Sequence, residues 1–377
     1  MPGDGAVLAA RVPVRLRRRQ AARHRGPAQP GGLGLIVLDG TVREGGGQIL
    51  RTALALAAAT GQPFRIERIR AGRKPPGLKA QHLAGVQAVA RLCNAYVAGA
   101  ELGAMALTFE PGPITASRVE ARIGTAGSIP LLLQAVLFPC LVAPHPVELH
   151  LEGGTDVRGG PPWDSITEVL LPCFRRLADI EVSVTCRGFY PPGGGQVRIR
   201  MHPSGYTKPL SLARRGEVTA LHGRSMAGRA LQEREVAERQ AKAVRDLLRK
   251  VDVRVDYHDS PSPGSAVVLW AETDTGCRIG ADCLGEPRRP AEEVGKRAAR
   301  QLKARLDTGC AVDEHLTDQL VPLLAWCGGE LHSEVLSEHT WANLYVVEQF
   351  LGKRIEVEES ASRLTCTVGA ARTFTKS

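Results

Sequence analysis

The sequence is poor in aromatic residues and lacks a long apolar segment. Phe, Trp and Tyr make up 4% of the 377 residues, so a core must be built mainly from Ala, Leu, Val and Ile. No apolar run reaches the roughly 18 residues of a membrane-spanning helix, and the N-terminal arm lacks the apolar region of a secretory signal. The apolar stretch 129–143 contains Gln134 and two prolines, which favours a buried helix. These absences predict a protein that makes no contact with a membrane.

Paired cysteines are also absent. The nine cysteines are odd in number and scattered, and no CxxC pair occurs among them. Disulfide frameworks and zinc sites are typical of paired cysteines at regular spacings, so both are disfavoured. A reducing, cytoplasmic setting is the expected location.

Positive charge is present but unevenly distributed. Residues 1–26 contain seven arginines and one acidic residue, Asp4, and so carry +6 of the net charge of +10. The remaining chain is only mildly basic, which permits binding to a polyanion without arguing strongly for it. We expect residues 1–34 to form a basic, disordered extension, with a misassigned start codon as the alternative.

Apolar periodicity and turn residues predict strands and helices that alternate along the chain. We expect strands at 35–39, 63–70, 105–110, 117–123, 147–151, 181–186 and 196–201, and helices at 48–60, 79–93, 128–142 and 163–177. GGGQ occurs at both 45–48 and 193–196, which favours two or three copies of an α/β unit.

The pattern changes after about residue 216. A strand at 217–222, a charged helix at 231–250 and strands at 252–257, 265–271 and 276–281 predict a small inserted domain over 216–285. Helices at 291–306, 313–326 and 340–352 and strands at 353–358 and 363–368 then return to the main domain.

Two segments have the composition of phosphate-binding loops. EGGGQILRTAL (44–54) places three glycines before a helix, where backbone can approach an anion closely and the helix N-terminus favours negative charge. IRAGRKPPGLKAQHL (69–83) places Arg70 and Arg73 in a Pro-Gly loop, and arginine donates paired hydrogen bonds to phosphate. Taken alone, the first segment could equally be a tight turn and the second a solvated basic loop.

Four other features could carry chemistry. The amide of Gln134 interrupts an apolar helix and must be satisfied by backbone or ligand. Trp163, in the Gly/Pro-rich loop 153–164, could stack on a base or anchor the loop. His315 and Asp318 are three residues apart and share a helix face. They could form a surface ion pair, or they could bind a metal or a ribose. His339, between the possible caps Ser337 and Thr340, is either a cap residue or a nucleophile at phosphorus.

The order of the motifs resembles that of a known family. EGGGQILR, RAGRxxPGLxxQHL, GSxxLLLQxVL, GGTD, FYPPGGGQ, HLTDQL and SEHTxxN follow one another over residues 35–352, as in the RNA 3′-terminal phosphate cyclases. The resemblance implies an α/β (α+β) fold. A large domain of repeated βαβαββ units, 35–215 and 286–377, would carry a small inserted α/β domain, 216–285.

The resemblance also implies a reaction. In this family a histidine attacks the α-phosphate of ATP, AMP passes to an RNA 3′-phosphate, and the vicinal 2′-OH closes a 2′,3′-cyclic phosphate. By resemblance His339 is adenylylated, and a divalent cation, Mg²⁺ or Mn²⁺, assists, with Asp318 as its candidate ligand. The implied ATP contacts are Gln134, Pro161, His315, Leu316, Thr317, Asp318 and Gln319. The implied contacts to phosphates or the RNA 3′-end are Glu44, Gln48, Arg51, Arg70, Arg73 and Gln81.

Departures from the family pattern concern the nucleotide. Ser165 stands where an aromatic residue often follows the proline of the adenine slot, and His315 stands where a tyrosine is often found. Neither change removes a reacting group, so we expect both to affect the affinity and specificity for the nucleotide rather than the reaction.

The principal alternative to a cyclase is a non-catalytic cyclase-like protein of rRNA processing, and the presence of His339 argues against it. A second alternative, an enolpyruvyl transferase, would not account for the HLTDQ and SEHT motifs. The oligomeric state is left open.

Overall fold

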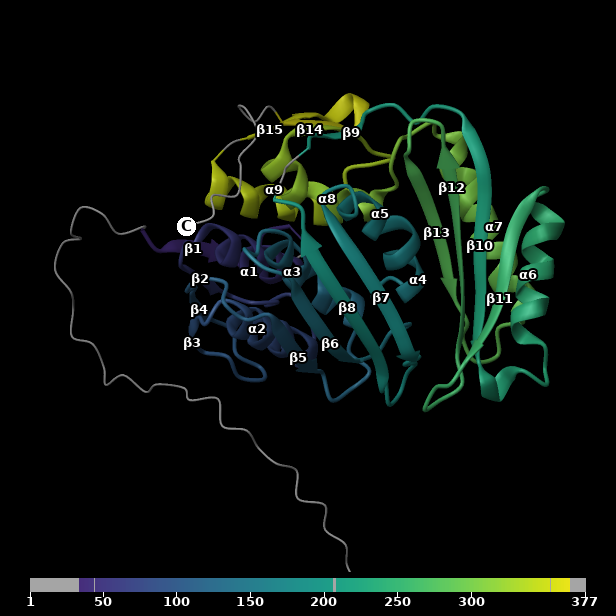
Figure 1. Cartoon of the computed structure of the whole chain (residues 1–377), viewed down its shortest axis with the longest axis horizontal. Coiled ribbons are helices and arrows are strands. Elements are labelled where there is room, and N and C mark those ends of the chain that lie inside the picture. The colour runs from purple at the N-terminus through teal and green to yellow at the C-terminus, as the bar shows by residue number, and fades with distance from the viewer. Residues whose placement is uncertain (1–33, 44, 206–207, 353, 367–377) are drawn as a thin grey trace, which may run out of the picture. The chain divides into compact units, whose positions relative to one another are not determined.

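The computed structural model describes residues 34–43, 45–205, 208–352 and 354–366, and the account below concerns these residues (Figure 1). The extension predicted over 1–34 lies outside them except for Gly34, and so does Glu44. Within the described ranges no helix combines the length and the apolar character needed to cross a membrane.

The first repeated unit has the order βαβαββ. It consists of β1 (Ile36–Asp39), α1 (Gln48–Thr60), β2 (Phe64–Glu67), α2 (Ala80–Leu92), β3 (Tyr96–Ala98) and β4 (Leu107–Glu110). The strands form a sheet in the order β1-β2-β4-β3, in which β1 and β2 are parallel and β4 is antiparallel to both its neighbours.

The second unit repeats this topology. It consists of β5 (Arg118–Arg122), α3 (Ile129–Leu141), β6 (Val147–Gly153), a helical segment from α4 (Trp163–Ser165) through a π-helical turn (Ile166–Leu170) to α5 (Leu171–Phe174), β7 (Ala178–Cys186) and β8 (Gly195–Pro203). Its sheet has the order β5-β6-β8-β7, with β5 and β6 parallel.

The third unit is interrupted after its first strand. It consists of β9 (Leu210–Leu212), α8 (Glu314–Cys327), β14 (Gly329–His332), α9 (Glu338–Leu351), β15 (Ile355–Glu358) and β16 (Arg363–Cys366). The sheet order β9-β14-β16-β15 and the strand directions match those of the other two units. The predicted fold class is therefore confirmed.

The insertion between β9 and α8 forms a fourth sheet. Its elements are β10 (Val218–Gly228), a 3₁₀ turn (Arg229–Leu231), α6 (Val236–Leu247), β11 (Val251–His258), β12 (Ser265–Thr273), β13 (Arg278–Leu284) and α7 (Ala291–Asp307), and its strand order is β11-β10-β12-β13. Val294, Ala298 and Leu302 of α7 join α6 and the sheet in one apolar cluster. The predicted division into domains stays a proposal, and these contacts favour ending the inserted part at Asp307 rather than at 285.

The helices of the three units pack on one another. α1 contacts α3 of the second unit and α9 of the third. Eleven of the 13 residues of α3 are buried, as expected of a helix that is apolar on nearly every side and lies in a core. Strands such as β5 and β8 alternate buried and exposed residues, so each of these sheets turns one face to the helices and the other to solvent.

The helix predicted at 163–177 contains a π-helical turn for a local reason. Pro172 has no backbone N–H, so it cannot donate to the carbonyl of Glu168 four residues earlier. That carbonyl instead accepts a hydrogen bond from the guanidinium of Arg278 on β13. The substitute donor joins this helix to the inserted sheet.

The packing of α7 can be tested by a stability measurement. Leu302 is fully buried, whereas the adjacent Lys303 is exposed. We expect Leu302→Ala to lower the free energy of unfolding by about 2–4 kcal/mol because it leaves a cavity. Lys303→Ala should change it by less than about 0.5 kcal/mol. Equal urea midpoints for the two variants would contradict the packing described here.

Candidate active site

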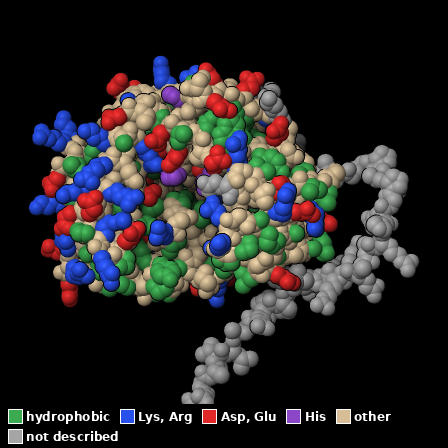
Figure 2. Space-filling model, turned by 180° about the vertical axis from the view of Figure 1, so that it is seen from behind, with side chains coloured by type: hydrophobic (Ala, Val, Ile, Leu, Met, Phe, Trp, Pro, Cys, Tyr) green, Lys and Arg blue, Asp and Glu red, His purple; other side chains and the backbone are tan. Residues whose placement is uncertain are grey.

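All six helical segments of the three units begin on the same side of their sheets. Each follows one of the parallel strands β1, β2, β5, β6, β9 or β14, and the carboxyl ends of parallel strands lie at one edge of a sheet. Their first turns line a single cavity of about 890 Å³. The cavity opens on the face seen in Figure 2, where Lys, Arg, Asp, Glu and His side chains surround a hollow.

A glycine allows α1 and α2 to start close together. A Cβ atom at Gly47 would lie 2.2 Å from Nε2 of His82 and 3.1 Å from Nη1 of Arg51. The last glycine of the GGG run is therefore required by the approach of these two side chains, whatever ligand lies beside it.

Basic side chains gather at the end of the cavity formed by α1, α2 and the loop before α2. Arg51 donates from Nε to Oε1 of Gln134 at 3.0 Å and from its guanidinium to Oε1 of Gln48. Burial lowers the pKa of Arg51 to about 10, with the charge of Asp318 opposing the shift, so the group stays cationic at neutral pH. Glutamine amides therefore hold this cation in place.

The Pro-Gly loop is built around Arg70. Its Nη1 donates to the carbonyls of Pro75 at 3.0 Å and Gly77 at 2.7 Å, and burial followed by the charge of Arg73 lowers its pKa. Gln81, at the start of α2, accepts the backbone N–H of Ser128 at 3.1 Å. Arg73 is exposed at the cavity wall. Arg70 thus shapes the loop that presents Arg73.

His82 is a neutral group among these cations. Its Nδ1 accepts the backbone N–H of Lys79 at 3.1 Å, which leaves the ring proton on Nε2 at the cavity wall. Burial, then the charges of Arg51, Arg70 and Lys79, lowers the pKa of His82 to about 3. The ring can donate one hydrogen bond to an anion without adding charge.

A buried network joins the first and third units below the cavity. Oδ1 of Asn343, a fully buried residue of α9, accepts hydrogen bonds from Gln48 at 3.0 Å and Thr52 at 2.6 Å. Nδ2 of Asn343 donates to the carbonyl of Asp318 at 2.6 Å. Through Gln48 and Arg51 the network reaches Gln134 of the second unit.

His339 lies in the first turn of α9, at the cavity wall. Ser337 caps this helix by accepting the backbone N–H of Thr340 at 3.1 Å. Oδ1 of Asp318 accepts hydrogen bonds from the hydroxyls of Ser337 at 2.6 Å and Thr340 at 2.7 Å. Burial raises the pKa of Asp318, and the nearby charges of His339 and His315 oppose this. A histidine at a helix N-terminus can hold a phosphoryl group where anions are favoured.

Most residues proposed from the sequence meet in this cavity. Those that line it are Gln48, Arg51, Arg70, Arg73, Gln81, Gln134, Pro161, His315, Leu316, Asp318, Gln319 and His339. Thr317 is absent from this wall: it is fully buried, and its hydroxyl contacts the carbonyl of Asp313 at 2.9 Å and Ser333 at 2.7 Å. Trp163 is also buried and anchors its loop, its backbone N–H donating to Oδ1 of Asp156 at 3.1 Å.

Several wall residues were missed from the sequence. Lys74, Lys79 and His82 belong to the same basic segment as Arg70 and Arg73, so the composition of that segment could have indicated them. Asp282 of β13 and Arg305 of α7 come from the insertion. No local pattern marks those two, because tertiary packing alone brings them to the cavity.

A metal site made by protein side chains alone is not found among the described residues, since no three His, Cys, Asp or Glu side chains cluster suitably. Oδ1 of Asp318 is already occupied by two hydroxyl donors. Magnesium is often held by one or two carboxylates together with substrate phosphates. A divalent cation at this site therefore stays a prediction, and the reaction steps proposed for the side chains do not depend on it.

Comparison with known proteins identifies the family. The family model described as RNA 3′-terminal phosphate cyclase matches residues 42–357, which include every residue of the cavity wall. The chain belongs to this family. It is similar to proteins named RNA 3′-terminal phosphate cyclase from Methanopyrus kandleri (46% identity, 86% of this chain and 96% of that protein) and Caldivirga maquilingensis (43%, 89% and 98%). The similar protein of that name from Pyrococcus abyssi is 43% identical over 86% of this chain and 95% of its own.

Family membership gives the cavity an enzymatic context. The cyclases are ATP-dependent enzymes of the ligase class, and this chain is an enzyme of that family. The match covers these relatives almost end to end. The described part of this chain contains three βαβαββ units and an inserted sheet.

The neutral state of His82 predicts a pH dependence of stability. Its pKa in the folded protein lies below the ordinary value near 6.5, so unfolding takes up a proton between about pH 6.5 and 3. This stabilising contribution is complete above pH 6.5 and is lost as the pH falls, at up to about 1.4 kcal/mol per pH unit. His82→Asn keeps an acceptor for Lys79 but does not titrate. Urea unfolding at pH 4 to 7 should show the wild type losing stability faster than the variant; parallel curves would rule out a neutral, buried His82.

Proposed function

We propose that the chain converts an RNA 3′-terminal phosphate to a 2′,3′-cyclic phosphate with consumption of ATP, using His339 as the nucleophile. The observation that carries the proposal is the position of His339 at a helix N-terminus, in the same cavity as Arg51, Arg73 and His82. A cavity with these groups suits three successive transfers at phosphorus. A non-catalytic cyclase-like protein would have no use for a histidine at this place.

In the first step a nitrogen of the His339 imidazole attacks the α-phosphorus of ATP. The N–P bond forms as the bond from the α-phosphorus to the bridging oxygen of the β-phosphate breaks, and pyrophosphate leaves with that electron pair. Arg51 and the Nε2–H of His82 can hold phosphate oxygens near the N-terminus of α9. Fixed donors of this kind stabilise charge that develops at phosphorus.

In the second step an oxygen of the RNA 3′-phosphate attacks the same phosphorus, and the N–P bond breaks to release His339. In the third step the 2′-oxygen attacks the RNA phosphorus and loses its proton, and AMP leaves. Arg73 and Gln81 belong to the loop and helix start that would hold the RNA phosphate. Positioning supplies much of the rate in such intramolecular closures.

The nucleoside would occupy the wall formed by Pro161 and the first turns of α8. Nε2 of Gln319 donates to the carbonyl of His315 at 2.8 Å, while its Oε1 is buried without a hydrogen-bond partner among the described residues. A ribose hydroxyl would satisfy that acceptor. Leu316 and Pro161 supply apolar surface for the base.

We also expect Mg²⁺ or Mn²⁺ to accompany the nucleotide, and we place the activity in the cytoplasm. All nine cysteines lie in the described ranges and are free, and eight of them are buried. This state of the thiols is compatible with a reducing compartment.

The covalent step can be tested directly. Incubation with α-labelled ATP in a magnesium buffer should give an acid-labile protein–AMP adduct, detected by label and by intact mass. His339→Ala should abolish it. His150→Ala, which removes a ring paired with Glu148 on β6 outside the cavity wall, should leave it unchanged. An adduct that persists in His339→Ala would exclude His339 as the nucleophile.

The phosphate-binding role of the basic loop can be tested separately. Arg73→Ala should lower kcat/KM for cyclisation roughly 10- to 100-fold, as expected for loss of a charge-assisted hydrogen bond. Arg118→Ala, which removes one side of an exposed pair with Glu120, serves as the control. An unchanged kcat/KM for Arg73→Ala would exclude a phosphate-binding role for this loop.

A further inference from the structure

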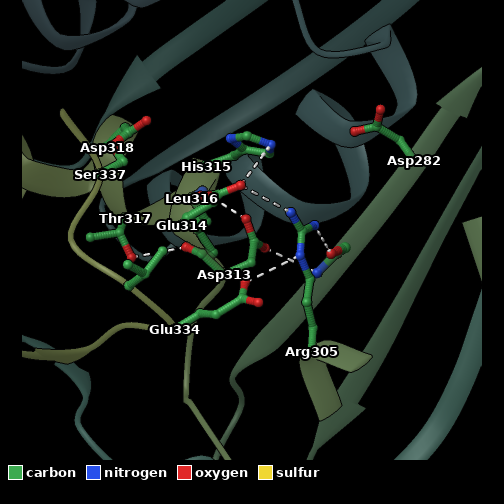
Figure 3. Close-up of polar contacts among 12 residues, drawn as sticks. Asp282, Arg305, Asp313, Glu314, His315, Leu316, Thr317, Asp318, Glu334 and Ser337 are labelled. Atoms are coloured by element: carbon green, nitrogen blue, oxygen red, sulfur yellow. Dashed lines mark hydrogen bonds and ion pairs between the residues drawn. The ribbon is translucent and has the colours of Figure 1, made fainter. Parts of the chain in front are cut away.

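The two ends of the cavity differ in chemistry. The basic end contains Arg51, Arg73 and His82, whereas the other end is formed by the 159–161 turn, Ser165 and Asp282 of β13. His315, at the start of α8, interacts electrostatically with both Asp318 and Asp282. Figure 3 shows its ring on the side of α8 that faces Asp282, while Asp318 lies by Ser337. The order along the wall is therefore His339, Asp318, His315 and Asp282.

The carboxylate of Asp282 retains unused acceptor capacity. Oγ of Ser165 donates to its Oδ2 at a long 3.4 Å, and this is its one hydrogen bond among the described residues. Burial raises the pKa of Asp282, and the charges of His315 and Arg305 oppose the shift. A carboxylate at a cavity wall with one weak donor is a site for a further N–H or O–H group.

Arg305 does not neutralise Asp282 by direct contact. Its Nη1 donates to the carbonyl of Gly280 at 2.5 Å, and its other nitrogens lie 3.3 Å from Glu334 and 3.7 Å from Glu314. Figure 3 shows this guanidinium turned toward Glu314 and Glu334, with Asp282 standing apart. The carboxylate of Asp282 therefore lies at the cavity wall and makes no direct ion pair with Arg305.

The charge of the cavity fixes the direction in which a nucleotide lies. A triphosphate held to His339 through its α-phosphorus is attracted to Arg51 and Arg73 and repelled by the carboxylate of Asp282. The charge of Arg305, near Asp282, is offset by Glu314 and Glu334. Its uncharged base is directed to the opposite end, beside Pro161, Ser165 and Asp282. At that end an ionised carboxylate can accept a hydrogen bond but cannot donate one.

We propose that Asp282 selects adenine by accepting a hydrogen bond from the exocyclic 6-amino group, with Ser165 as the residue that positions the carboxylate. The inference rests on the proposed function, because it takes His339 as the point of attachment. The same carboxylate repels the 6-carbonyl oxygen of guanine or hypoxanthine. Asp282 thus acts on the choice of nucleotide and not on the reacting phosphorus.

The contact can be tested by removing each partner in turn. Purine riboside 5′-triphosphate has hydrogen where ATP has the 6-amino group. At subsaturating nucleotide we expect wild-type protein to form its covalent adduct at least about tenfold more slowly with this analogue than with ATP, as for loss of a hydrogen bond to a charged group. Asp282→Ala should react with the two nucleotides at rates within about twofold of each other.

Glu286→Gln is the matched control. Glu286 lines the neighbouring depression but not the main cavity, and it pairs with Arg289 at 2.9 Å. This variant should keep the preference of the wild type for ATP. Asp282→Asn, which is close in size to the native residue and can donate to a carbonyl, should raise the reactivity of GTP relative to ATP and tests the contact should Asp282→Ala fail to fold.

Three results would overturn the assignment: equal use of ATP and the analogue by the wild type, an undiminished preference for ATP in Asp282→Ala, or a preference of the wild type for GTP. A wild-type protein that forms no adduct with any nucleotide would instead overturn the proposed function itself, and this inference with it. Measurement of the intact mass of the protein after incubation with each nucleotide answers both questions in one experiment.

Discussion

The convergence of six helix N-termini on one cavity is the constraint on which the rest of this structure depends. Six helical segments, two from each βαβαββ unit, start at one cavity, because each follows a parallel strand and those strands end at one edge of their sheets. Each start leaves backbone N–H groups without helical partners and adds partial positive charge. Arginines of α1 and of the loop before α2 add to this field at one end of the cavity. The repeated topology therefore supplies the positive field that the proposed phosphate contacts require, and the side chains refine it.

Holding the reacting group in place requires that the three units do not shift against one another. Asn343 meets this need by accepting from Gln48 and Thr52 of α1 while donating to the carbonyl of Asp318. Asp318 in turn accepts from the cap of the helix that carries His339. Because these groups are largely buried, breaking one of their hydrogen bonds costs more free energy than breaking the hydrogen bond of an exposed group. The asparagine of SEHTxxN thus positions the histidine of the same motif through two other helices.

The parts of the site that could be predicted from the sequence are those with a local signature. Short segments were enough to recognise the glycine run, the basic loop, the amide of Gln134 within an apolar helix, and His339 beside a helix cap. The order of these motifs along the chain indicated the family. The strands β3, β9 and β14 were not predicted, because each of these short segments shows no clear alternation and is defined by its pairing with other strands. Thr317 was proposed as a ligand contact with the rest of HLTDQ, yet on a helix its neighbours face the cavity while its own hydroxyl turns to Asp313 and Ser333.

If Asp282 selects the base as proposed, the insertion would allow nucleotide choice to vary without loss of the reaction. It enters between β9 and α8, at the edge where the helices start, so β13 and α7 are delivered to the cavity wall. Asp313 fixes this junction: one carboxylate oxygen caps α8 through Leu316 at 2.9 Å, and the other accepts the backbone N–H of Gly280 at 3.1 Å. His339, Asp318, Arg51 and Arg73 belong to the repeats, whereas Asp282 and Arg305 belong to the insertion. On this proposal, a substitution on β13 would alter the group that meets the base while the groups around phosphorus keep their geometry. The departures at Ser165 and His315 lie at this same boundary, since both side chains interact with Asp282 of the insertion.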